Sequence, residues 1–170
     1  MQDHWKKLEF IFPDGWQVEK LDDTAFYRKH FQGFADSKSV DMAAFKLDGD
    51  ELWLLEVKDY RIDRRTKTLD LFKEVALKVR DTLALLYLAK GKPEISIHRF
   101  ASEAVGKATI RVVLHMEQPA NPSKLYPLIV ERGNVRIKLQ QILRVVDPHA
   151  QFCEMSTMPP DCYWQVTPKP

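Results

Sequence analysis

The stretch SVDMAAFKLDGDELWLLEVKDYR, residues 39–61, decides the fold of this chain, because two apolar runs flank a turn within it. An apolar run, the turn D-G-D and a second apolar run are typical of a β-hairpin. Asp48 and Gly49 are a strong signal for a two-residue type I′ turn, in which both central positions need positive φ. Each run nevertheless contains an acid, Asp41 before the turn and Glu56 after it, and Lys58 follows. The central question is why these charges lie in apolar strands.

The expected turn fixes which residues face each other across the hairpin. Phe45 then pairs with Leu52, and Asp41 falls directly opposite Glu56, with Cβ atoms about 5 Å apart on one face. Side chains alternate along a strand, so Lys58 lies on the same face as Glu56. The sequence therefore predicts that two carboxylates and one ammonium group converge.

Apolar residues occupy both faces of the expected hairpin, which indicates that it is covered on both sides. Burying acids there costs on the order of several kcal/mol unless they are paired or bind a metal ion. Two carboxylates this close also repel, and one takes up a proton unless a cation lies between them. Mg²⁺ accepts one or two carboxylates and keeps several waters, so Asp41 and Glu56 suit this ion. A water polarised by the metal and placed by Lys58 would be a nucleophile for a phosphodiester.

Asp41, fourteen intervening residues and then Glu56-Val57-Lys58 resemble the motif of the PD-(D/E)xK nuclease superfamily, although no proline precedes Asp41. The resemblance covers about residues 17–115. It implies that Asp41, Glu56 and the backbone carbonyl of Val57 bind Mg²⁺ or Mn²⁺, and that Lys58 positions the attacking water. Asp41, Glu56 and Lys58 would then be the catalytic residues of a metal-dependent nuclease. The family often adds an acid from its first helix, for which Glu19 is the candidate.

The rest of the chain predicts an α/β fold. Apolar residues recur every three or four positions at 68–90, which is typical of a helix, and a β-branched strand follows at 108–117. A long helix between the hairpin and another strand suggests a crossover, hence a mixed central sheet with flanking helices. We expect an α-β-β-β-α-β core, similar to that of the nuclease family, and a C-terminal α-β-β extension at 120–170, all in one domain, 1–170. The other expected elements are a helical segment at 17–22, a strand at 24–31, a helix at 136–143 and strands at 144–147 and 162–166.

The segment KDYRIDRRTK, residues 58–67, places five basic residues against two acids directly after the hairpin. A charge run of this kind is typical of a solvated loop. It also suits electrostatic contact with a phosphate backbone, and the resemblance favours DNA over RNA as the partner. In that interpretation, the residues that contact nucleic acid are Tyr60, Arg61, Arg64, Arg65 and Lys67, with Lys73 on the following helix as a further candidate.

Two other interpretations of the hairpin charges remain open. In the first, Lys58 or Arg61 neutralises Asp41 and Glu56 in a structural ion pair, and no metal binds. In the second, a nuclease fold without catalysis binds nucleic acid or a protein partner. The sequence does not distinguish either from an active enzyme.

The sequence also bounds the location and the partners of the chain. No run approaches the length of a membrane span, and the first residues lack the apolar core of a signal peptide. We therefore expect a cytoplasmic chain with no membrane partner, in which Cys153 and Cys162 remain thiols; a disulfide between them is the alternative. A zinc site of these two cysteines with His149 lacks standard ligand spacing. A nuclease of 170 residues without a separate recognition domain would have low sequence specificity, form a homodimer or bind a partner subunit.

Overall fold

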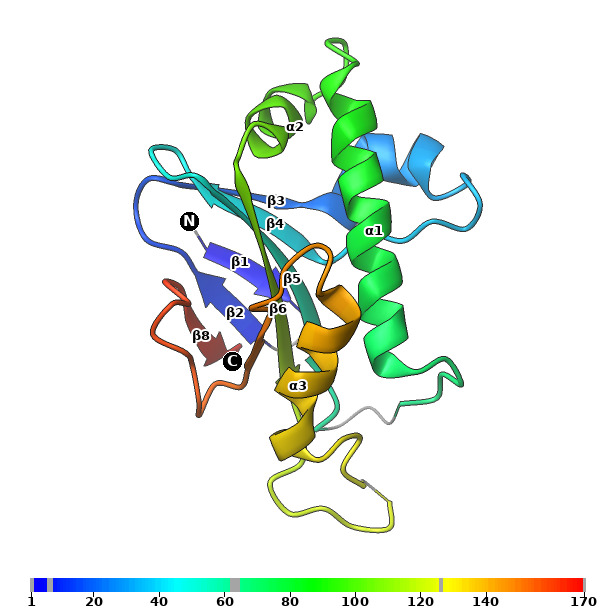
Figure 1. Ribbon diagram of the computed structural model, residues 1–170, viewed down its shortest axis with the longest axis vertical. Coiled ribbons are helices and arrows are strands. Elements are labelled where there is room, and N and C mark those ends of the chain that lie inside the picture. The colour runs from blue at the N-terminus through cyan, green and yellow to red at the C-terminus, as the bar shows by residue number, and fades with distance from the viewer. Residues whose placement is uncertain (1, 6–7, 62–64, 126, 170) are drawn as a thin grey trace.

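Figure 1 shows a computed structural model of the chain, which describes residues 2–5, 8–61, 65–125 and 127–169. Its centre is a five-stranded sheet in the order β3-β4-β5-β6-β7. Strand β4 is antiparallel to both β3 and β5, whereas β6 runs parallel to β5 and β7 runs parallel to β6. The fold is therefore α/β with a mixed sheet, as the sequence predicts. The bounds of the strands are Trp16–Lys20 (β3), Met42–Lys46 (β4), Glu51–Asp59 (β5), Thr109–Glu117 (β6) and Gln151–Cys153 (β7).

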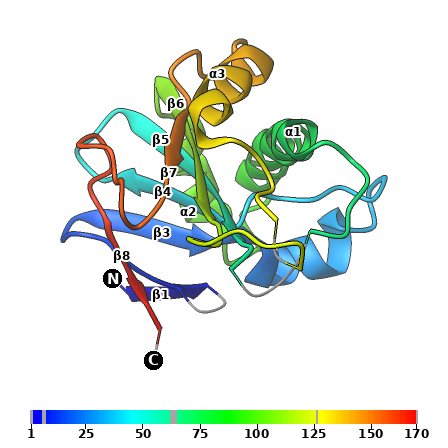
Figure 2. The same ribbon diagram turned by 90° about the horizontal axis from the view of Figure 1, so that it is seen from below.

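Two different layers cover the two faces of the central sheet (Figure 2). Helices α1 (Leu71–Lys90), α2 (His98–Val105) and α3 (Arg132–Leu143) bury apolar side chains against one face. A three-stranded antiparallel sheet of β1 (Gln2–Trp5), β2 (Leu8–Ile11) and β8 (Gln165–Pro168) lies over the other. The hairpin is therefore buried on both sides, as its two apolar faces predict. None of the helices in the described ranges is long and apolar enough to cross a membrane.

The hairpin of β4 and β5 has the predicted register, because Phe45 pairs with Leu52 and Met42 pairs with Leu55. The predicted type I′ turn at Asp48 and Gly49 is wrong. The N–H of Gly49 donates to the carbonyl of Lys46 at 3.1 Å, so the turn is centred one position earlier in a four-residue loop, and neither Asp48 nor Gly49 has positive φ.

The reason for the different turn is a contact from outside the hairpin. The ammonium of Lys107 donates to three carbonyls of the loop, those of Lys46, Leu47 and Gly49, at 3.1, 3.3 and 2.7 Å. A four-residue loop keeps the same partners facing each other as a two-residue loop centred on the same point. The register therefore survives the change of turn.

The secondary structure predicted before the hairpin is reversed in the structure: the expected helix is a strand, and the expected strand is helical. Residues 17–22 were predicted to be helical, but Trp16–Lys20 is a strand, in which Trp16 and Val18 are buried and the residues between and after them are not. Residues 24–31 were predicted to be a strand, but they follow a 3-10 turn at Leu21–Asp23 and form a helical segment that includes the π-helix Tyr27–Phe31. The Thr24 hydroxyl accepts from the N–H of Tyr27 at 3.2 Å and so starts this segment as an N-cap. The core order is consequently β-α-β-β-α-α-β.

The last third of the chain follows the predicted order of one helix and two strands, at different positions. Helix α3 begins at Arg132, four residues before its predicted start at 136. The strand predicted at 144–147 is wrong, because these residues end the helix in turns and leave Val145 94% exposed. The strand that joins the central sheet is instead β7, and β8 joins the small sheet.

Candidate functional site

Asp41 lies where the pairing of β4 with β5 ends, and its backbone and side chain both contact β5. Its N–H donates to the carbonyl of Leu55 at 3.1 Å, and its Oδ2 accepts from the N–H of Val57 at 2.6 Å. The carboxylate is therefore held beside Glu56, on the face of the sheet that α1 covers. Asp41 is 4% exposed and Glu56 is fully buried. The structure thus brings together the two acids that the register predicts.

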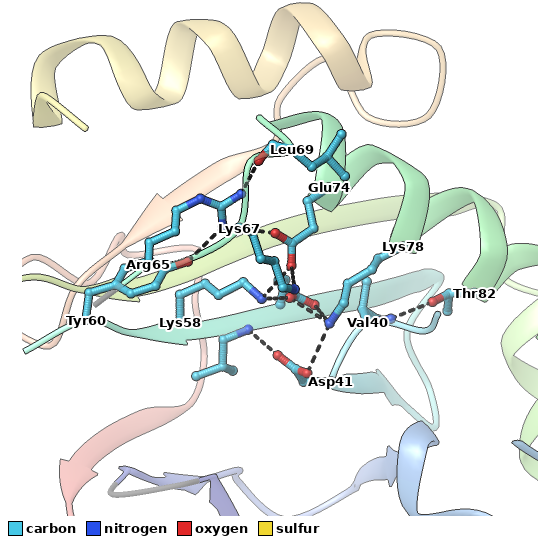
Figure 3. Close-up of polar contacts among 12 residues, drawn as sticks. Val40, Asp41, Lys58, Tyr60, Arg65, Lys67, Leu69, Glu74, Lys78 and Thr82 are labelled. Carbon is cyan, nitrogen blue, oxygen red and sulfur yellow. Dashed lines mark hydrogen bonds and ion pairs between the residues drawn. The ribbon is translucent and has the colours of Figure 1, made fainter. Parts of the chain in front are cut away.

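Helix α1 faces these acids with a row of polar residues at four-residue spacing, Glu74, Lys78 and Thr82 (Figure 3). Glu74 and Thr82 are buried and Lys78 is nearly so, because this face of the helix packs on the sheet. The hydroxyl of Thr82 accepts from the N–H of Val40 at 2.8 Å, which fixes the strand just before Asp41. Sequence analysis missed this row, although its spacing is that of one helix face.

Lys78 occupies the place between the two acids. Its Nζ lies 2.8 and 2.9 Å from the carboxylate oxygens of Glu56 and 3.5 Å from Oδ1 of Asp41. This is the place where the sequence predicts a metal ion. In the structure, an ammonium group supplies the cation that the two buried carboxylates require.

Lys58 lies beside Glu56, as predicted, and links it to Glu74. Its Nζ is 2.5 Å from Oε1 of Glu56 and 3.2 Å from Oε1 of Glu74. Two residues of the basic segment also contact Glu74: Lys67 at 2.5 Å and Arg65 at 2.9 Å. The acids and bases therefore form one connected network, in which Glu74 binds three cations.

The network shifts the pKa values of its members in opposite directions. Burial, followed by the charge of Glu56, raises the pKa of Asp41 to about 7, and Lys78 offsets only part of this. Burial alone would lower the pKa of Lys58, but its contacts with Glu56 more than compensate and raise it. Burial would likewise raise the pKa of Glu74, yet Lys67, Lys58 and Arg65 lower it to about 2. The nearby cations therefore compensate the burial of Asp41 only in part, whereas they more than compensate that of Glu74.

The acid expected from a first helix, Glu19, does not lie on a helix, because it lies in strand β3 and pairs with Ala43. A second acid from this region, Asp22, interacts electrostatically with Lys78. The pKa of Asp22 is raised by burial and by Asp23, and Lys78 offsets part of this. Asp22 follows β3 in the 3-10 turn, and its Oδ1 is buried with no hydrogen-bond partner among the described residues.

The side chains that were predicted to contact nucleic acid have different environments in the structure. Arg61 binds the carboxylate of Asp59 at 2.7 and 2.9 Å, so it does not neutralise Asp41 or Glu56. Arg65 donates to the hydroxyl of Tyr60 at 3.1 Å and to the carbonyl of Leu69, besides Glu74. Lys73 is exposed near the start of α1, and Arg64 lies outside the described residues. Arg65 and Lys67 therefore fold back onto the network.

A cleft of about 500 Å³ opens beside the network, between α1 and the segments at 35–38 and 66–69. Four basic side chains line it, those of Lys38, Lys67, Lys78 and Arg80, against three acids. Lys78 and Glu74 belong to this lining, whereas Asp41 and Glu56 do not. The two deeply buried carboxylates are thus screened from the cleft by residues of α1.

Among the described residues, no three His, Cys, Asp or Glu side chains are grouped as a metal site. Asp41 and Glu56 nevertheless provide two carboxylates around one cation position. The N–H of Val57 points at Asp41, and the carbonyl of the same residue faces the same edge of the strand. These three donors fit a hard divalent cation if Lys78 moves aside. Cys153 and Cys162 are free thiols with sulfur atoms 3.4 Å apart.

The bond from Val40 to Thr82 gives a first testable prediction. Replacing Thr82 with valine keeps the shape of the side chain but leaves the buried N–H of Val40 without its acceptor. We expect this to lower the free energy of unfolding by about 1–3 kcal/mol in urea denaturation. Thr82→Ser retains the hydroxyl and should lose clearly less. A larger loss in Thr82→Ser than in Thr82→Val would show that the methyl group, rather than the hydrogen bond, stabilises this contact.

Comparison with curated proteins finds a partial likeness. In the matched region the chain is 33% identical to a cysteine--tRNA ligase of Neisseria meningitidis serogroup A. The match covers 76% of this chain and 23% of that protein, so the chain spans less than a quarter of the length of the curated relative. No protein-family model matches the chain, and no solved structure matches it.

Proposed function

We propose that the chain hydrolyses phosphodiester bonds of nucleic acid with a divalent metal ion, in the manner of the PD-(D/E)xK nucleases that its motif resembles. The observation that carries this proposal is the pair of buried carboxylates, Asp41 and Glu56, around a single cation position, with Lys58 next to Glu56. An acid pair of this kind is costly to bury, so its position on adjacent strands calls for a cation. A protein ammonium and a divalent ion are alternative occupants of that position.

Asp41, Glu56 and the carbonyl of Val57 would hold the metal, with Asp22 as a further acid near Lys78. When bound, Mg²⁺ or Mn²⁺ would supply charge stabilisation at the phosphate and a water of lowered pKa. Without the metal, Lys58 and Lys78 balance the two carboxylates. A divalent ion in the position of the Lys78 ammonium would bring one more positive charge than the ammonium, which an anionic phosphate would offset. The site is therefore suited to bind metal and phosphate together.

The chain's own residues have distinct tasks in this proposal. Lys58, held between Glu56 and Glu74, presents a fixed ammonium group that can orient a water or contact a phosphate oxygen. Glu74 holds Lys58, Lys67 and Arg65 in place and acts through them as a positioning residue. The cleft beside Lys78 has a surplus of basic side chains and would admit the phosphate backbone.

A cleavage assay tests the proposal. Wild type is incubated with single- and double-stranded DNA and RNA, with Mg²⁺, with Mn²⁺ and with EDTA. We expect cleavage only with metal, and a loss of about a hundredfold or more in Glu56→Gln, since even outer partners of metal ligands contribute about 10–100-fold. The matched control is Glu103→Gln, an exposed acid on α2, which should cleave like wild type. Cleavage that survives Glu56→Gln would contradict the assignment of this site.

A second candidate is a module that binds nucleic acid without cleaving it. It is favoured by the position of Lys78. The ammonium group of Lys78 compensates the negative charge of the two acids, and its side chain separates them from the cleft. The partial likeness to a tRNA ligase makes RNA the partner to test first under this candidate. It predicts no cleavage, no thermal shift with Mn²⁺, and RNA binding that Glu56→Gln leaves unchanged. Metal-dependent cleavage by wild type would exclude it.

A further inference from the structure

A second cavity, of about 410 Å³, lies on the other side of the central sheet from the acid network. It is lined by side chains of β3, of the hairpin and of the segment before β8. Trp53 of β5 points into the layer between the two sheets, whereas Glu56 of the same strand points toward α1. The cavity therefore shares no lining residue with the cleft beside Lys78, and the proposed function does not use it.

Three aromatic rings form a corner of this cavity. The ring of Tyr163 lies 5.9 Å from that of Trp16, tilted by 39°, and 6.2 Å from that of Trp53 at 85°. Trp16 and Trp53 are largely buried and form the floor, whereas Tyr163 is 57% exposed and forms a wall. Trp164 packs behind both tryptophans, with ring centres 6.4 and 5.4 Å away, and holds them in place. Tyr163 therefore supplies most of the aromatic surface that is open to a ligand, because Trp16 and Trp53 are only 7% and 3% exposed.

The polar residues around this corner are mostly acidic. Asp14, Asp50 and Glu51 line the cavity against one cation, Lys46. The ammonium of Lys46 lies 3.1 Å from the carboxylate of Asp48, so part of its charge is already compensated. Glu51 is likewise bound by Arg111 at 2.8 Å, so the excess of carboxylates rests on Asp14 and Asp50. The cavity consequently combines aromatic rings with these two acids, which attract cations and repel phosphates.

We propose that this cavity binds an alkylated ammonium group, either of a small free cation or of a methylated lysine side chain. Aromatic corners attract such groups through the quadrupoles of the rings, while the alkyl groups bury apolar surface against them. The nearby acids add long-range attraction, and the volume suits a group of this size. A nucleotide is the poorer ligand, because its phosphate would meet the carboxylates of Asp14 and Asp50. The inference is independent of the proposed phosphodiester hydrolysis.

Tryptophan fluorescence, checked by calorimetry, tests the inference on the full chain. The probes are choline and its uncharged tert-butyl analogue, 3,3-dimethyl-1-butanol, at constant ionic strength. We expect saturable binding of choline and at least about tenfold weaker binding of the uncharged analogue. A peptide that carries trimethyllysine, compared with its unmodified form, distinguishes the two sources. If the source is a side chain, the methylated peptide binds more tightly than choline. If it is a free cation, choline binds at least as tightly.

Variants of Tyr163 locate the binding. Tyr163→Ala removes the exposed wall and should weaken choline binding about fivefold or more, whereas Tyr163→Phe retains the ring and should keep most of it. Tyr87→Ala changes another exposed tyrosine, on α1, and should have no effect. The inference is overturned if neither choline nor the methylated peptide binds, if the uncharged analogue binds equally well, or if a folded Tyr163→Ala protein binds like wild type.

Discussion

Replacing Lys78 with methionine is expected to lower the free energy of unfolding at pH 8 by about 3–5 kcal/mol. Lys78 contacts both Asp41 and Glu56, and methionine fills a similar volume without a charge. The variant therefore leaves two buried carboxylates with Lys58 as their close cation. Chemical denaturation in the absence of divalent ions measures the loss. Lys73→Met, a change of an exposed lysine on the same helix, is the matched control and should stay within about 0.5 kcal/mol of wild type.

Divalent ions make this variant informative about function. If Asp41 and Glu56 can hold a metal, removing Lys78 opens their cation position, and Mn²⁺ should stabilise the variant more than it stabilises wild type. An ion present at a hundred times its dissociation constant adds about 2.7 kcal/mol, so most of the loss should be recovered. A destabilised variant that does not respond to Mn²⁺ would remove the main support for a metal site and favour the non-catalytic candidate.

Replacing Asp41 with asparagine is expected to change the pH dependence of stability by a few kcal/mol. The pKa of Asp41 is raised from 3.8 to about 7, so between these values the folded protein binds a proton that the unfolded chain has lost. Wild-type stability should therefore fall as pH rises from about 4 to about 7, by on the order of a few kcal/mol from this group. Asparagine does not titrate, and its side-chain oxygen can still accept from the N–H of Val57.

The quantity to compare is the difference in free energy of unfolding between Asp41→Asn and wild type, measured from pH 4 to pH 8. The free energy of unfolding of Asp41→Asn should increase relative to that of wild type up to about pH 7. Above this pH the difference should stay constant. Glu74 contributes with the opposite sign, because its pKa is lowered to about 2 and its stabilisation is lost as pH falls from about 4.5. Since Glu74 is present in both proteins, it cancels from the difference to first order. A flat difference would show that Asp41 is ionised in the folded protein at all these pH values.

The sequence contains enough to predict the hairpin but not the shape of its turn. The register of Phe45 with Leu52 follows from the turn signal at Asp48 and Gly49, which is local information, and the observed four-residue loop has the same centre. The turn depends on Lys107, a residue about sixty positions away whose ammonium binds the loop carbonyls. The sequence contains a signal for the helical segment at 24–31, which was wrongly predicted to be a strand. Thr24 is a strong N-cap residue, and it precedes aromatic residues with a helical spacing.

The sequence predicts only part of the observed network of acids and bases. Asp41, Glu56 and Lys58 follow from strand alternation and register, so their convergence was predictable. Lys78 and Glu74 lie on a helix, where a charged residue is ordinarily solvated. Only the packing of α1 over β5 brings them to the acids, and this depends on how the helix rotates about its axis. The spacing of Glu74, Lys78 and Thr82 marks one face, but it does not say that the face is buried.

The pairing of β2 with β8 has a consequence for how the chain reaches this fold. Glu9 and Thr167, which face each other in the small sheet, are separated by 158 positions. Their pairing requires β3 and β7, which adjoin β2 and β8 along the chain, to be in place first, so it is expected to be a late step. Until it is complete, the face of the central sheet that carries Met42 and Trp53 lacks its cover. We therefore expect a folding intermediate whose central sheet is formed on the helical side and still prone to aggregate on the other.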